Sequence, residues 1–490
     1  MVQLKTIEGK KTGLSINRVL LLLILIIYIA LLTIPRLLIN YGMDADAVRG
    51  VKAAVHLWET GYYHPSRLPG NPLFEYILAG IAPWGGHIAT NLFVLIGFCS
   101  ALLAFALLTS KKENRFLLLA LFATTPILLL NAATTMDYLP GLALLLFSYV
   151  FIIKKKYLLS AVFLALSISF RLTNLLFLFP LIFYMVQEKE RIARILRLSI
   201  LSLALGLSLY IPIVARTGLR PFLFPFQFGG FIAYLFRGGY NAIMLFGTIA
   251  TLGIAVLIII HLKKIVQVLK KSSSDSSFYP EIVTIILFLL VFLLHPDEPT
   301  YLIPLIPFLY LSFSRWLSKK GLIFLLTLIA SFAFINLDLK GGESGKRRLA
   351  VKLDWGIVAQ DYYNRHELEL LRQGLGKFNL SEKAVIITGM GPTLTYQNPW
   401  LTLAGKEQIS PGLKEIAIGE ESEVYRISGQ DVYLVYSMPL SAVKLLQSEG
   451  YAIYVFSMFA PSIAINEYGY DPQEVGISTL SIFNEETFYK

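Results

Sequence analysis

The sequence has little charge and almost no cysteine. Only 15% of its 490 residues are charged and 56% are hydrophobic, whereas a soluble protein carries about 25% charged residues. The single Cys99 excludes a disulfide within the chain and a metal site built from cysteines. The six histidines show no zinc-like spacing, and no internal sequence repeat is present. These absences exclude a disulfide framework and a zinc site built from cysteines and histidines.

Long apolar runs recur through the first two thirds of the chain and predict an α-helical polytopic membrane protein. The first run is too long for the core of a signal peptide, and no small-residue cleavage site follows it. We expect about eleven transmembrane helices, in apolar runs at about 19–39, 87–109, 116–132, 139–153, 157–186, 198–215, 241–261, 280–294, 301–314 and 321–337.

The run at 157–186 is interrupted by a charge at its centre. At 1.5 Å per residue its length suits one steep helix or two short ones. A lone arginine in the middle of the bilayer is costly, so two short helices with Arg171 at the turn between them are the better solution. This pair counts as two of the eleven spans.

The basic residues give the expected orientation. The part of the chain before Asp338 holds 29 basic and 13 acidic side chains, and the remainder holds 14 and 19. On the eleven-span topology, 21 of the 29 basic residues lie on one side of the membrane and 8 on the other. The side with more lysine and arginine faces the cytoplasm. We therefore expect a multi-pass plasma-membrane protein with a cytoplasmic amino terminus, and the basic excess does not indicate nucleic-acid binding.

The tail at 338–490 predicts a small α/β domain outside the cytoplasm, following the transmembrane domain at 1–337. Its apolar runs have the length of strands, at 384–388, 432–436 and 451–456, and stretches at 361–376 and 440–448 have helical character. Gly389–Pro392 follow the first of these strands. Such a glycine turn can hold a phosphate, but an ordinary strand-to-helix turn is the favoured interpretation.

Residues 41–76, between the first two apolar runs, carry most of the unusual polar side chains. This segment contains two aspartates, a glutamate and an arginine that could take part in chemistry: Asp44, Asp46, Arg67 and Glu75. The alternative is a solvated loop that caps the membrane domain. Asp46 also suits the N-cap of a helix that begins at Ala47.

Further ionisable residues fall on the same outer side of the expected topology: Asp137, Arg171, Arg237, His295, Asp297, Glu298 and Tyr301. A carboxylate among them can act as general base on an acceptor hydroxyl or amine. An arginine can hold a phosphate through its planar set of donors. A base and a phosphate holder are what transfer from a membrane-borne phospho-sugar requires, because the lipid phosphate is already a good leaving group.

The order of these motifs resembles the GT-C superfamily of glycosyltransferases, in the branch of protein O-mannosyltransferases and aminoarabinose lipid A transferases. The segment His295–Leu309 is similar to a motif near the late spans of that family, and Arg171 opens a short helix that runs to Pro180. The matching residues of the first loop are Asp44, Asp46, Ala53, Ala54, Gly61, Tyr62, Tyr63, Arg67, Pro69, Gly70, Pro72 and Glu75.

The resemblance implies a first outer loop at 40–86 with two membrane-surface helices, at about 46–60 and 70–81. It implies a polyprenyl-phosphate-linked sugar as donor and an inverting single displacement onto a protein, lipid or glycan. The family's catalytic acid opens a D-E pair, whereas this chain has D-A-D at Asp44–Asp46. Either aspartate is therefore a candidate for the base, and the other is expected to position a ligand.

We expect Arg171, Arg237 and His295 to bind the donor phosphate. Asp137, Glu298, Tyr301, Arg67 and Glu75 are expected to position substrate. Structural alternatives stand beside each: Arg171 pairs with Asp137, His295 and Glu298 cap the next span, and Arg67 and Glu75 pin the loop. The aromatic residues at 221–240 either anchor the chain at the membrane interface or guide the lipid tail.

Two other classes of function compete with a transferase. A transporter or lipid-glycan flippase would carry charges in mid-span and broken helices in paired halves, which the sequence lacks beyond Arg171. A polysaccharide polymerase or ligase would favour a long late outer loop, whereas here the long loop is the first. No cofactor is expected to be required, although carboxylates are numerous enough to hold a divalent metal.

Overall fold

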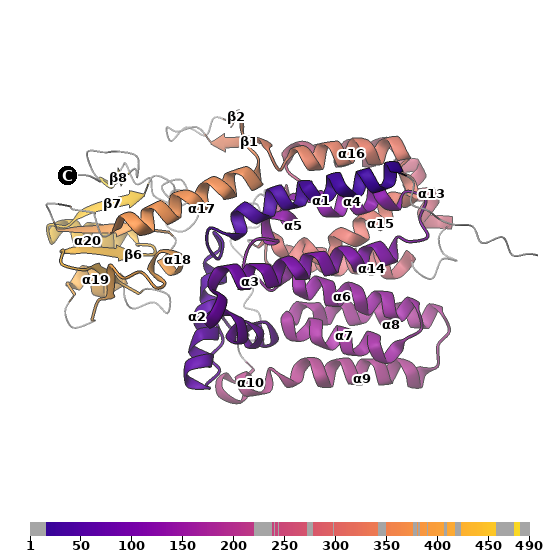
Figure 1. Ribbon diagram of the computed structural model, residues 1–490, viewed down its shortest axis with the longest axis horizontal. Coiled ribbons are helices and arrows are strands. Elements are labelled where there is room, and N and C mark those ends of the chain that lie inside the picture. The colour runs from indigo at the N-terminus through magenta and orange to yellow at the C-terminus, as the bar shows by residue number, and fades with distance from the viewer. Residues whose placement is uncertain are drawn as a thin grey trace, which may run out of the picture.

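The computed structural model describes most of the chain in two regions (Figure 1). The described residues are 16–219, 238–239, 241–243, 245–271, 278–296, 298–341, 349–375, 380, 383–389, 391–405, 409–416, 423–456 and 475–480. Helices make up the first region, and a mixed sheet with short helices makes up the second. Figure 1 shows α2 lying across the end of the helical region that faces the sheet.

Three helices form the amino-terminal part and frame the first loop. They are α1 (Ile16–Leu37), α2 (Ala45–Thr60) and α3 (Pro72–Leu108). Asp44 caps α2 by accepting a hydrogen bond from the Asp46 amide at 2.9 Å, so the cap is Asp44 and not Asp46 as the sequence suggested. Gly61 ends α2 in the left-handed conformation, with φ of 68°.

Helix α3 contains both the surface helix expected at 70–81 and the span expected at 87–109. Pro72 occupies its first turn, where a missing amide costs nothing. Gly86 has φ of 52° and ψ of −145°, so the helix is kinked there. The kink separates the surface helix expected at 70–81 from the span expected at 87–109.

The remaining described helices of the first region have at most 17 residues. They are α4 (Arg115–Thr124), α5 (Pro126–Asn131), α6 (Tyr138–Ile153), α7 (Tyr157–Phe170), η1 (Leu172–Phe177), α8 (Leu178–Gln187), α9 (Ile192–Ser208), α10 (Ile211–Thr217), α12 (Thr248–Ile260), α13 (Leu262–Lys271), α14 (Phe278–Leu294), η4 (Pro299–Leu305), α15 (Ile306–Trp316) and α16 (Lys319–Ser331). A Cβ on Gly97 would lie 2.8 Å from Pro140, so this glycine permits the close packing of α3 on α6.

Two described helices are individually long and apolar enough to cross a membrane, at Leu20–Leu37 and Pro72–Leu108. Two bent pairs, Ile192–Ser208 with Ile211–Thr217 and Thr248–Ile260 with Leu262–Lys270, raise the number to four if each pair is one span. Prolines account for several of the shorter elements, since α4 and α5 are separated at Pro126 and η4 contains Pro304. The count of eleven spans stays a prediction.

The apolar run with a central arginine folds as two short helical segments. Helix α7 ends at Phe170, Arg171 has extended backbone dihedrals, and η1 begins at Leu172. The expected break at Arg171 is therefore present. It places the guanidinium at the end of a helix instead of in the middle of one.

The carboxyl-terminal region is built on a six-stranded sheet in the order β4-β5-β6-β3-β7-β8. Its strands are β3 (Ala384–Ile387), β4 (Leu401–Leu403), β5 (Tyr425–Ile427), β6 (Val432–Val435), β7 (Ala452–Phe456) and β8 (Ser478–Leu480). The three strands predicted from the sequence are the adjacent parallel strands β6, β3 and β7. Strands β3 and β6 are fully buried, which explains their uninterrupted apolar sequence.

Short helices and one hairpin complete this region. The helices are α17 (Ile357–Gly374), α18 (Gly391–Thr395), α19 (Pro411–Ile416) and α20 (Leu440–Ser448). The antiparallel strands β1 (Ile335–Gly341) and β2 (Leu349–Trp355) connect α16 to α17. The last apolar run therefore ends as a helix at Ser331, and its final residues enter β1 instead of continuing the span expected at 321–337.

A buried ion pair joins the two regions. Arg36 in α1 donates to Asp361 in α17 at 2.8 Å, and Arg365 donates to the same carboxylate at 2.8 Å. The exposed fractions of the three side chains are 1%, 7% and 0%. The arginines also donate to backbone carbonyls, including those of Leu129 and Ala133. Because a buried charge is costly unless it is paired, this contact fixes α17 against the helical region.

We expect Asp361→Ala to destabilise the whole protein, because it leaves two buried guanidiniums without their carboxylate. The expected loss is about 3–5 kcal/mol of unfolding free energy, measured as a fall in the thermal midpoint of purified protein in detergent. Asp431→Ala is the control, since its pair with Arg426 is half exposed and contributes about 0–1 kcal/mol. Equal midpoints for the two variants would contradict the structural role of the pair.

Candidate functional site

Polar side chains from the first loop, α6 and the α7–η1 turn meet in one charged cluster. Arg67 pairs with Asp46 through one nitrogen and lies 3.6 Å from Asp137 Oδ1 through the other. The second oxygen of Asp137 accepts from Arg171 Nη1 at 3.2 Å. Arg49 donates to Asp46 Oδ1 at 2.9 Å. Acids and bases therefore alternate from Asp46 to Arg171, with Asp137 only 1% exposed at the centre.

The acidic residues and Arg171 lie at the ends of helices, whereas Arg67 comes from the loop between α2 and α3. Asp44 and Asp46 stand at the start of α2, Asp137 at the N-cap of α6, and Arg171 at the C-cap of α7. Residues at helix ends project beyond the apolar helix bodies, so charges can gather here without entering them. Figure 1 places this end of the helical region next to α2.

Asp44 differs from the other carboxylates because no arginine forms an ion pair with it in the described part of the chain. It is half-buried and accepts a hydrogen bond from the Asp46 amide at 2.9 Å. Burial first, and then the negative charges of Asp46 and Glu298, raise the pKa of the Asp44 carboxyl to about 7. A carboxylate with a pKa near neutrality is suited to general-base chemistry.

A cavity of about 120 Å³ opens beside the two arginines. It is lined by Arg67, Arg171 and Tyr301, together with Leu68, Pro69, Gly70, Asn71, Leu172 and Thr173. The Arg171 guanidinium lies over two tyrosine rings, at 4.3 Å from the centroid of Tyr138 and 4.8 Å from that of Tyr301. Two arginines and the Tyr301 ring thus border a small space, and Tyr138 packs against Arg171 behind it.

Glu75 forms no ion pair with this cluster among the described residues, and it fixes the first loop. Its two oxygens accept hydrogen bonds from the Tyr63 hydroxyl at 2.6 Å and from the Ser66 amide at 3.2 Å. Glu75 is 1% exposed. Of the two loop residues that the sequence left undecided, Arg67 lies in the cluster and Glu75 has the structural position.

The residues of the late motif, His295–Leu309, contribute to the site to different degrees. Glu298 is near enough to Asp44 to raise its pKa, and Tyr301 lines the cavity. The ring centroids of His295 and Tyr301 lie 6.0 Å apart. His295 therefore lies beside a tyrosine that borders the cavity. Arg237, Asp297 and the aromatic residues at 221–237 lie outside the described residues, so their predicted roles stay predictions.

Sequence reasoning missed Tyr138. It directly follows Asp137, and its hydroxyl is buried without a hydrogen-bond partner among the described residues. Buried polar atoms of this kind usually require an explanation. A tyrosine beside an outer-loop aspartate was the available signal, but a tyrosine at a helix end is also common at membrane interfaces.

No family model and no curated protein matches the chain. Its structure is similar to that of ArnT from Cupriavidus metallidurans in the apo state, with a TM-score of 0.40 and 12% identity over 64% of this chain and 62% of that one. The structure of the same protein bound to undecaprenyl phosphate gives a TM-score of 0.43 and 14% identity over 66% and 64%.

The similar region thus spans less than two thirds of the ArnT chain. At this degree of similarity, the role of each residue depends on the geometry of this chain alone.

We expect Glu75→Ala to loosen the first loop and to lower the unfolding free energy by about 3 kcal/mol. The change leaves the Tyr63 hydroxyl and the Ser66 amide without their acceptor, at about 1–3 kcal/mol for each unsatisfied group. Thermal unfolding and limited proteolysis of residues 61–71 measure the effect. Glu59→Ala, at an exposed position of α2, is the control, and matching proteolysis rates would refute the pinning role.

Proposed function

We propose that the chain is a membrane glycosyltransferase that moves a sugar from a polyprenyl phosphate to an acceptor outside the cytoplasm. The proposal rests on the position of the half-buried Asp44, whose pKa is about 7. Asp44 lies beside the charged cluster, and Arg67 and Arg171 of that cluster line a cavity. A base of matched pKa and a cationic cavity at the end of apolar helices provide the two groups that such a transfer needs.

Asp44 is the better candidate for the base. Asp46 is engaged by two arginines, Arg49 and Arg67, which hold its charge and its orientation. The Asp44 carboxylate can accept a proton from an acceptor hydroxyl or amine as the nucleophile attacks the anomeric carbon. The bond from that carbon to the phosphate oxygen breaks in the same displacement, so the configuration inverts.

The two arginines can hold the donor phosphate. A guanidinium has five N–H donors, and the side chain of Arg171 uses one of them for Asp137. Asp137 fixes both arginines from one buried position, so they are oriented before a ligand arrives. The unpartnered Tyr138 hydroxyl supplies another donor, and Tyr301 borders the cavity where the sugar would lie.

The remaining features fit the same proposal. The sugar is a hexose or a pentose, the acceptor is a protein, lipid or glycan, and the protein resides in the plasma membrane with the site and the carboxyl-terminal region outside. Among the described residues, no group of three or more histidine, cysteine or acidic side chains could hold a metal. We propose that Arg67 and Arg171, which line the cavity, stabilise the leaving phosphate.

We expect Asp44→Asn to lower the rate of sugar transfer and of slow donor hydrolysis by at least about 100-fold, because the base is lost while the helix cap is kept. The measurement uses purified protein in detergent with radiolabelled polyprenyl-phosphate sugars. The comparison includes Asp46→Asn, Arg171→Ala and the double change Asp44→Asn, Asp46→Asn.

Arg171→Ala should weaken donor binding, whereas Asp44→Asn should leave donor binding intact. Full activity of both variants would contradict the assignment of the site. Failure of the wild-type protein to bind any phospho-sugar would instead favour a transporter or a polymerase.

The rate should rise with pH through about 7, because only the deprotonated Asp44 accepts a proton. The raised pKa of this acid means that the base is lost as the pH falls below 7. Glu298→Gln removes one of the negative charges that raise the pKa, so the midpoint of the kcat/KM profile should move to lower pH. Glu59→Gln, at an exposed position of α2, is the control. An unchanged midpoint in Glu298→Gln would exclude Asp44 as the titrating base.

A further inference from the structure

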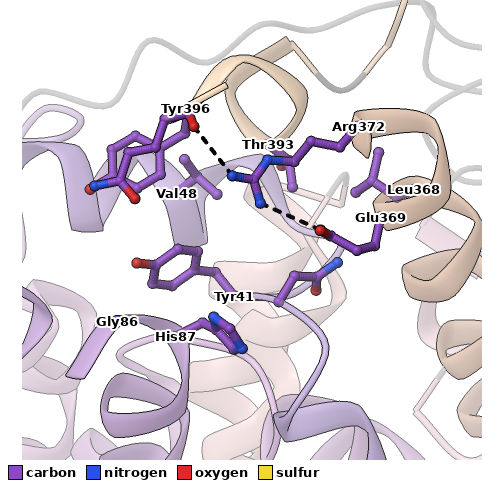
Figure 2. Close-up of a pocket in the computed structure, with 11 residues that line it drawn as sticks. Tyr41, Val48, Gly86, His87, Leu368, Glu369, Arg372, Thr393 and Tyr396 are labelled. Carbon is purple, nitrogen blue, oxygen red and sulfur yellow. Dashed lines mark hydrogen bonds and ion pairs between the residues drawn. The ribbon is translucent and has the colours of Figure 1, made fainter. Parts of the chain in front are cut away.

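A second polar cavity lies where the carboxyl-terminal region meets the helical region. Its volume is about 210 Å³, and its lining comes from the start of α2, the kink of α3, and α17 and α18 with the residues that follow. Figure 2 shows Arg372 and Glu369 on one side of it and Tyr41 and His87 on the other. At about 30 Å³ per water molecule, this space holds roughly seven waters, or one small polar ligand.

Three of the residues that line this cavity each carry a buried polar atom with no hydrogen-bond partner among the described residues. These atoms are Arg372 Nε, Thr393 Oγ1 and Tyr396 Oη. Thr393 is only 7% exposed. A buried polar group without a partner costs about 1–3 kcal/mol, so three of them around one space indicate a ligand that completes their hydrogen bonds.

The charges at the cavity favour a neutral ligand. Arg372 is balanced by Glu369 at 3.4 Å, and the Glu369 carboxylate also accepts from Gln373 at 3.0 Å. Glu59 lies close enough to raise the pKa of Tyr396 by its negative charge, although burial of that hydroxyl is the larger cause. With one arginine and two glutamates nearby, a phosphate or a carboxylate would gain little from the local field.

The chemistry of the unpartnered atoms matches a ligand with several hydroxyls. The Thr393 and Tyr396 hydroxyls can donate and accept, and Arg372 Nε can donate only. The Tyr41 and Tyr396 rings are 5.9 Å apart at an interplanar angle of 72°, so they form an aromatic corner beside the polar groups. A sugar ring combines hydroxyls at its rim with C–H groups that pack on such rings.

We propose that this cavity binds a single neutral sugar residue of the acceptor. This inference rests on the proposed transferase function, and it makes the acceptor a glycan or glycoconjugate. The segment that carries Asp44 also supplies Tyr41 and Val48 to the cavity. The sugar would therefore be bound next to the chain segment of the base, while the donor phosphate would be held by Arg67 and Arg171.

The first test needs no ligand. Because the Thr393 and Tyr396 hydroxyls have no hydrogen-bond partner among the described residues, the double change Thr393→Val, Tyr396→Phe should leave the thermal midpoint of the empty protein unchanged or raise it. The comparison variant is Thr402→Val, Tyr433→Phe, which removes a threonine and a tyrosine hydroxyl from the sheet, where Thr402 donates to the Arg426 carbonyl. A midpoint that falls by several degrees only in the cavity variant would show that the protein itself uses these hydroxyls, and would overturn the proposal.

The second test measures sugar binding by saturation-transfer NMR with protein in detergent. The probes are millimolar methyl glycosides of glucose, galactose, mannose and N-acetylglucosamine, with inorganic phosphate as competitor. We expect binding of at least one glycoside that phosphate does not displace, that the cavity variant weakens about tenfold, and that the comparison variant retains. Displacement by phosphate, binding equal in all three proteins, or no binding of any glycoside would overturn the proposal.

Donor hydrolysis separates this inference from the transferase function. The cavity variant should hydrolyse a radiolabelled polyprenyl-phosphate sugar at the wild-type rate, since neither residue touches the charged cluster. Loss of glycoside binding with hydrolysis retained supports an acceptor site. Glycoside binding by a wild-type protein that never hydrolyses a donor would refute the transferase function and with it the acceptor role.

Discussion

The alternation of acidic and basic side chains from Asp46 through Arg67 and Asp137 to Arg171 is the interaction on which this architecture depends. Charges at the end of an apolar helical region are costly unless each has an opposite partner. Here the partners come from the first loop, α6 and the α7–η1 turn, so satisfying them determines where these three segments lie. Loss of Asp137 would leave Arg171 without its carboxylate, whereas Arg67 would keep its pair with Asp46.

The same series of ion pairs gives Asp44 and Asp46 different properties. Asp46 forms ion pairs with two arginines, Arg49 and Arg67, which fix its position. Asp44 is turned into the helix cap and faces other carboxylates, so its pKa rises to about 7. Two positions along one helix start are enough to separate an acid held in two ion pairs from an acid with a pKa near neutrality, because among the described residues arginines form ion pairs with Asp46 and not with Asp44.

Much of this arrangement could be predicted from the sequence, and the failures have physical causes. The break at Arg171, the parallel strands β6, β3 and β7, and the gathering of Asp137, Arg171 and the first-loop aspartates follow from periodicity and from the cost of burying charge. The assignment of the cap to Asp44 and the end of α16 at Ser331 depend on backbone geometry that residue type alone does not determine. The cavity around Arg372 was beyond prediction, because its lining comes from segments more than 300 positions apart.

The ion pair between Arg36 and Asp361 can form only late in the synthesis of the chain. Arg36 is synthesised 325 residues before the carboxylate that neutralises it, which at about 5–20 residues per second is roughly tens of seconds of translation. During that interval the guanidinium at the end of α1 has only water, lipid headgroups or backbone carbonyls as partners. Assembly of the helices around α1 is therefore completed late, when α17 docks, and the ribosome must deliver nearly three quarters of the chain before the first helix reaches its final surroundings.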